Sequence, residues 1–120
     1  MSAPAFSQID RTPWPGGSAE KIAVTRVRPE LIARAFEVEF FEDGGRQGAA
    51  IRMRSGRVLE LVRQSSGRGS GTEVHAHATD DFVSALREFL AAFDLSPEDL
   101  SWIQPSIRAE IRGAQRQAPA

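Results

Sequence analysis

Cysteine is absent from this chain of 120 residues. Its absence excludes disulfide frameworks, thiolate catalysis and the common cysteine-based zinc modules. Residues 1–17 lack the basic region and apolar stretch of a secretion signal, and no run approaches the roughly 20 apolar residues of a membrane span. We therefore expect a cytoplasmic protein that does not contact membranes.

An excess of charge of one sign is lacking too, because the formal net charge is -1. This balance argues against a surface that binds nucleic acid or anionic lipid as a whole, so any such binding must be local. The hydrophobic fraction of 41% and the charged fraction of 26% are those of an ordinary globular protein. A chain of this length predicts one packed core.

Residues 1–18 are rich in proline and glycine, which predicts an extended N-terminal arm outside the core. Three large apolar side chains, Phe6, Ile9 and Trp14, nevertheless occur on this arm. Two interpretations of Trp14 stay open. Either it folds back over an edge of the chain's own core, or the arm grips a partner subunit.

Residues 19–104 predict an α+β domain. Residues 20–27 are compatible with a strand, and Pro29 to Ala35 read as a short helical turn that begins with proline. Alternation of apolar and polar residues then predicts four strands, at Phe36–Glu42, Ala49–Arg54, Arg57–Arg63 and Thr72–Ala78. Turn signals at 43–45 and 55–56 join the first three, and a serine- and glycine-rich mobile loop at 64–71 precedes the fourth. The expected sheet is a four-stranded antiparallel meander.

Apolar residues at helical spacing from Phe82 to Phe93 predict an amphipathic helix that covers the sheet, in the order β-β-β-β-α. Thr79 is its expected cap, and Asp80 and Asp81 follow at the positive end of the helix dipole. Ser96-Pro97-Glu98-Asp99 predicts the start of a short helix that continues through Leu100–Ile103. Residues 105–120 predict a C-terminal helix, up to Gln117, and a frayed tail.

No catalytic constellation is visible. The chain has no Gly-x-Ser-x-Gly elbow, and Gly67 to Gly71 lack the lysine of a phosphate-binding loop. His75 and His77 should project from one face of a strand, but no third metal ligand can be identified. We therefore predict no enzyme, no cofactor and no metal, with a pH-sensitive surface as the alternative role for the two histidines.

The leading functional hypothesis is a small protein-binding module, an accessory or adaptor subunit that binds another protein or a second copy of itself. The predicted partner-binding residues are large aromatic side chains outside the main helix, namely Trp14, Phe41 and Trp102.

The alternative is single-stranded nucleic-acid binding by a sheet face that carries arginines, namely Arg46, Arg52, Arg54, Arg57, Arg63 and Arg68. The order of four strands from Phe36 to Ala78 and one helix is similar to that of PUR-repeat single-strand binders. This resemblance is one of topology over about half of the chain, and it implies binding through the open face of the sheet.

Overall fold

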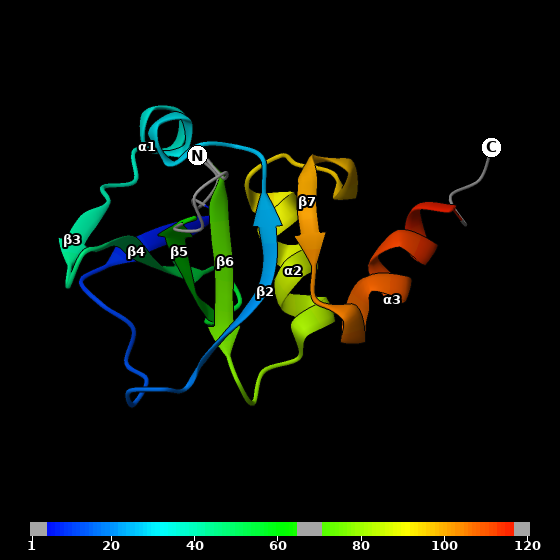
Figure 1. Cartoon of the computed structure of the whole chain (residues 1–120), viewed down its shortest axis with the longest axis horizontal. Coiled ribbons are helices and arrows are strands. Elements are labelled where there is room, and N and C mark those ends of the chain that lie inside the picture. Colours follow the sequence, from blue (N-terminus) through cyan, green and yellow to red (C-terminus); the bar gives the residue numbers. More distant parts are fainter. Residues whose placement is uncertain (1–4, 65–70, 117–120) are drawn as a thin grey trace.

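The computed structural model describes residues 5–64 and 71–116. In this part of the chain the fold is α+β, with one antiparallel sheet of seven strands and three helices (Figure 1). The elements in chain order are β1 (Phe6–Ile9), β2 (Ala19–Thr25), α1 (Pro29–Phe36), β3 (Phe41–Asp43), β4 (Arg46–Met53), β5 (Val58–Arg63), β6 (Thr72–His77), α2 (Phe82–Ala92), the 3₁₀ turn η1 (Pro97–Asp99), β7 (Leu100–Ile103) and α3 (Pro105–Arg116). No helix of the described part is long and apolar enough to cross a membrane.

The strand order is β1-β4-β5-β6-β2-β7, with β3 also paired to β4. The predicted meander is confirmed, because β3, β4, β5 and β6 are neighbours in sequence order. Gly44 and Gly45 supply the positive φ angles of 61° and 80° that the turn between β3 and β4 requires. The prediction of only four strands is wrong, because β1, β2 and β7 extend the sheet.

The predicted arm is corrected at residues 6–9, which form a strand of the sheet rather than an extension outside the core. They pair with β4, from Phe6 opposite Met53 to Ile9 opposite Ala50. The ring of Phe6 stacks on that of Phe93, with 4.7 Å between ring centroids. A segment of four residues is too short for its alternation to be read locally, and the edge of β4 supplies its partners.

Two further elements differ from expectation. α1 continues to Phe36 and ends at Glu37, whose φ of 56° is left-handed, so only Phe41–Asp43 of the predicted strand pairs with β4. Leu100–Ile103 is β7 and not a helix, because it completes the open edge of β2. Short apolar runs do not distinguish helix from strand, and tertiary pairing decided both.

The core lies between the sheet and α2, which Figure 1 shows behind β2 and β7. One row of buried residues crosses five strands, namely Ala49, Leu61, Val74, Ala23 and Ile103. From α2, Leu86 and Phe89 are fully buried against this face, as the helical spacing predicts. Residues of the opposite face alternate with these, and none of the three helices covers that face.

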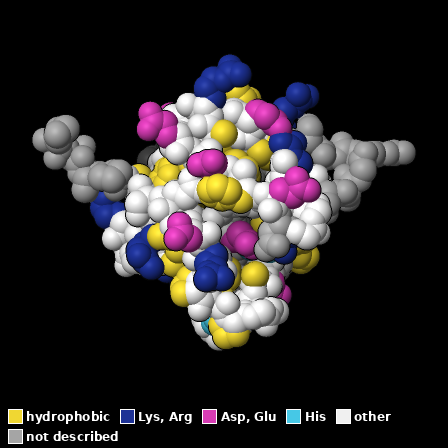
Figure 2. Space-filling view, turned by 90° about the vertical axis from the view of Figure 1, so that its left-hand side faces the viewer, with side chains coloured by type: hydrophobic (Ala, Val, Ile, Leu, Met, Phe, Trp, Pro, Cys, Tyr) yellow, Lys and Arg dark blue, Asp and Glu magenta, His cyan; other side chains and the backbone are white. Residues whose placement is uncertain are grey.

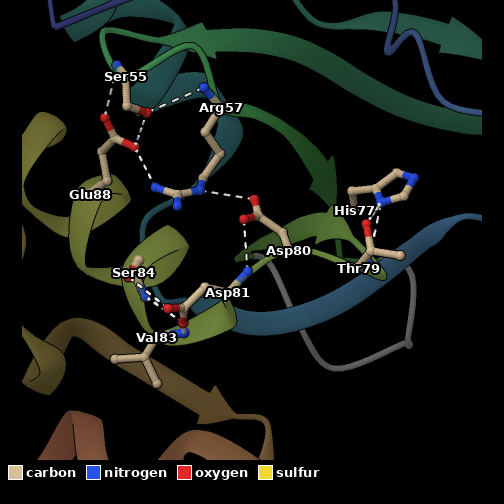
Figure 3. A network of polar contacts seen from close by, with 9 residues as sticks. All are labelled: Ser55, Arg57, His77, Thr79, Asp80, Asp81, Val83, Ser84 and Glu88. Carbon is tan, nitrogen blue, oxygen red and sulfur yellow. Dashed lines mark hydrogen bonds and ion pairs between the residues drawn. The ribbon is translucent and has the colours of Figure 1, made fainter.

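A network of polar contacts ties the hairpin between β4 and β5 to α2 (Figure 3). Arg57 Nε donates to Asp80 Oδ2 at 2.9 Å, and Arg57 Nη1 donates to Glu88 Oε1 at 2.9 Å. Ser55 Oγ donates to the same Glu88 carboxylate at 2.7 Å. Partial burial opposes the charged form of Arg57, but the bonds that Arg57 donates to the two carboxylates, and their negative charges, outweigh it and raise the pKa of Arg57.

The N-cap of α2 is Asp81, so the prediction of Thr79 as cap is wrong. Asp81 Oδ1 accepts the backbone N–H groups of Val83 and Ser84, and Oδ2 accepts Ser84 Oγ–H (Figure 3). The bonds from Ser84 and Val83 lower the pKa of Asp81, with burial opposing them. Thr79 instead bonds to His77.

We expect Gly71→Ala to lower the free energy of unfolding by about 1–3 kcal/mol, the usual cost of overpacking. A Cβ atom at residue 71 would lie 2.2 Å from the backbone oxygen of Thr25, which cannot move without disturbing β2. Chemical denaturation measures the change. Gly16→Ala is the matched control, because nothing lies within 4 Å of its Cβ position; equal stabilities of the two variants would contradict the packing argument.

We also expect the stability of Asp81→Asn to fall less than that of the native chain as the pH is lowered. The pKa of Asp81 is lower in the folded than in the unfolded chain, so its contribution is present above the unfolded value, about 4, and is lost as the pH falls through the folded value. Asparagine caps equally well but does not titrate. Melting temperatures between pH 6 and 2 should therefore fall less steeply for Asp81→Asn than for the native chain or for the exposed-site variant Asp94→Asn, and parallel curves would refute the assignment.

Candidate functional site at the edge of β4

The structure separates the three predicted partner-binding residues. Phe41 is on β3 at one edge of the sheet, and Trp102 is on β7 at the other. Trp102 is half-buried, with Lys21 Nζ 5.0 Å from its ring centroid. Trp14 is half-buried against the His77 ring, 5.5 Å away between centroids. Only Phe41 remains largely accessible, with 51% of its surface exposed.

The arginines of the nucleic-acid hypothesis do not gather on one face. Arg46 and Arg52 lie on the open face, whereas Arg63 alternates with buried Leu59 and Leu61 and so lies on the face that the helices cover. Arg57 closes the polar network described above. Arg54 is exposed in the turn between β4 and β5. Arg68 lies outside the described residues.

The two histidines do share the open face, as predicted, but each bonds to a neighbour on its own segment. His75 Nε2 lies 2.9 Å from Glu73 Oε1. His77 Nδ1 accepts the backbone N–H of Thr79 and lies 2.6 Å from its hydroxyl. Within the described residues, no group of three histidine or acidic side chains converges as a metal site would require.

An accessible hollow forms where two strands share one edge of β4. β1 pairs with residues 50–53 and β3 with residues 46–48, and both lie on the edge opposite β5. The two strands therefore lie end to end, with Ala49 at the gap between them. The floor of the hollow consists of the small residues Gly48, Ala49 and Ala50.

The walls of this edge hollow come from the segments that enter and leave the gap. Asp10 and Arg11 follow β1, and Phe41 begins β3. Arg46 and Glu60 close the remaining side. The volume is about 200 Å³. Figure 2 views the side of the molecule that carries this edge, and it shows hydrophobic atoms near the middle with both acidic and basic side chains around them.

Side-chain contacts hold both walls in place. Gln8 of β1 bonds to the backbone of Glu39, since its Oε1 accepts the Glu39 N–H at 2.8 Å and its Nε2 donates to the Glu39 carbonyl at 2.5 Å. These bonds fix the backbone at Glu39 and so help to position Phe41, which follows two residues further along the chain. The segment after Arg11 is tied down by the contact of Trp14 with His77.

One ion pair lines the edge hollow, and a second lies on the face of the sheet that the helices cover. Arg46 Nη2 contacts Glu60 Oε1 at 3.1 Å. Arg63 donates to Glu30 on α1, and this hydrogen bond lowers the pKa of the Glu30 carboxyl. Arg63 Nε also donates to Gln47 Oε1 at 2.7 Å. Both pairs are partly exposed, so each contributes little to stability.

Two residues of the edge hollow are among those predicted from the sequence, Phe41 for partner binding and Arg46 for the nucleic-acid alternative, and its other residues are not. The sequence predicts that Asp10 and Arg11 lie on an arm outside the core, and it gives Glu60 no role. The run of small residues at 48–50 inside a strand was the available signal, because small residues admit a close neighbour. Their relation to β1 depends on pairing across more than 40 residues.

Comparison of the chain with protein-family models, with curated proteins and with solved structures found no match.

Proposed function

We propose that this chain is a non-catalytic module that binds a partner protein at the edge hollow. The observation that carries the proposal is the exposure of Phe41 beside a depression that Arg11 and Arg46 also line. Aromatic and arginine side chains are enriched among the residues that dominate protein interfaces. A hollow of about 200 Å³ is smaller than typical small-molecule sites, about 300–1,000 Å³, and suits one anchoring side chain.

The fixed walls add to this argument. A preorganised site loses less conformational entropy on binding than a mobile one. The bonds between Gln8 and Glu39 hold the segment before Phe41, and pairing with Gly48 holds Phe41 itself. A paired strand therefore fixes the backbone of Phe41, although half of the surface of this residue is in contact with water.

The nucleic-acid alternative receives less support. Arg46, Arg57 and Arg63 each pair with a carboxylate, which reduces the positive charge that they offer to phosphates. Glu60 and Glu73 also occupy the open sheet face. We therefore keep protein binding as the proposed function.

We expect Phe41→Ala to weaken partner binding about ten-fold or more, the usual effect of truncating a central interface aromatic. Tagged native and variant chains would be used to recover interacting proteins from cells, and titration calorimetry with the purified partner would give Kd. Leu31→Ala is the matched control, because Leu31 is the other large hydrophobic side chain exposed among the described residues, at 53%, and it does not line the edge hollow.

A second variant tests the hollow separately from the ring. Ala50→Leu places a larger side chain on its floor and should weaken binding while Phe41 stays exposed. The proposal fails if folded Phe41→Ala and Ala50→Leu chains bind the partner as the native chain does, or if Leu31→Ala weakens binding equally.

A further inference from the structure

The edge hollow belongs to a longer depressed surface around the β3–β4 hairpin. Arg46 lines both the edge hollow and a second depression, which Glu42 also lines. Arg63 lines this second depression and a third one beneath α1, where Glu37 and Glu39 lie. We call these three adjoining depressions the hairpin surface.

The charge of the hairpin surface is unequal. Six described carboxylates and three arginines line it, and the pairs Arg46–Glu60 and Arg63–Glu30 neutralise two of each. Arg11 is the third arginine. The remaining carboxylates are exposed and make no ion pair with any described residue; they are Asp10, Glu37, Glu39 and Glu42.

This local excess of negative charge adjoins an apolar centre. Phe41 lines the edge hollow, where two carboxylates and two arginines balance. The other unpaired carboxylates lie in the neighbouring depressions, Glu42 in the second, and Glu37 and Glu39 in the third beside the apolar side chains of Phe40 and Val38. Figure 2 shows hydrophobic atoms on this side of the molecule among acidic and basic side chains. Such a surface repels phosphates and attracts a cation-bearing segment whose apolar side chain reaches the centre.

We propose that the hairpin surface binds a basic segment of a partner protein, in which lysines or arginines flank one apolar anchor that packs on Phe41. This inference rests on the proposed function and adds the chemistry of the partner. The carboxylates Glu37, Glu39 and Glu42 select the basic flanks, and the edge hollow receives the anchor.

Three synthetic peptides of equal length test the proposal, with the cores Lys-Lys-Leu-Lys-Lys, Lys-Lys-Ser-Lys-Lys and Glu-Glu-Leu-Glu-Glu between glycine-serine flanks. Each is titrated into the ¹⁵N-labelled chain, and amide shifts are followed by NMR at low and at physiological salt. We expect the lysine-leucine peptide to shift amides of the residues that line the hairpin surface, residues 39–48 among them, and to bind roughly ten-fold more tightly than either other peptide. Added salt should weaken the binding of the lysine-leucine peptide.

Two triple variants distinguish the effect of the carboxylates at the hairpin surface from the effect of the net charge of the chain. Glu37→Gln/Glu39→Gln/Glu42→Gln should weaken the lysine-leucine peptide by roughly ten-fold, since three exposed pairs are lost. The matched control Glu20→Gln/Asp94→Asn/Glu110→Gln removes the same charge from exposed sites elsewhere and should bind as the native chain does.

The outcomes also distinguish this inference from the proposed function. Equal binding of the acidic and basic peptides, shifts confined to residues that do not line the hairpin surface, or equal loss in both triple variants would overturn the basic-segment proposal. If the natural partner is lost in Phe41→Ala but retained in Glu37→Gln/Glu39→Gln/Glu42→Gln, the site stands and its charge preference is refuted. If Phe41→Ala retains the partner, the proposed function itself fails.

Discussion

The packing of Phe93 is the interaction on which the rest of this structure depends. Its ring lies 4.7 Å from the rings of both Phe6 and Phe36 and 4.8 Å from that of Phe89. One buried side chain therefore joins β1, α1 and α2, three elements that are far apart in the sequence. Each such aromatic pair contributes about 0.5–1.5 kcal/mol beyond the burial of area.

This cluster determines where the candidate site can form. With Phe6 held in the core, β1 must lie on the edge of β4, and with Phe36 held there, the chain must leave α1 toward the same edge. Two segments then meet along one strand, and a gap between them is the geometrical result. The edge hollow lies at this gap, over the small residues 48–50 of β4.

Charge has different roles in the two halves of the molecule. Around α2, Arg57 bonds to both Asp80 and Glu88, so the charges there are internally satisfied and hold the hairpin to the helix. Around the β3–β4 hairpin, exposed carboxylates outnumber the arginines. A net charge near zero therefore conceals an uneven distribution, which composition cannot report.

The sequence by itself determined the elements whose signal is local. Helical spacing from Phe82 to Phe93 specified α2, paired glycines specified the β3–β4 turn, and Pro29 marked the start of α1. Tertiary structure alone decided that Phe6–Ile9 and Leu100–Ile103 are strands, because an apolar run of four residues takes its conformation from the edge that it meets. For the same reason only the folded chain brings Arg11 to Phe41, since contacts across many residues depend on which strands pair and leave no mark on local periodicity.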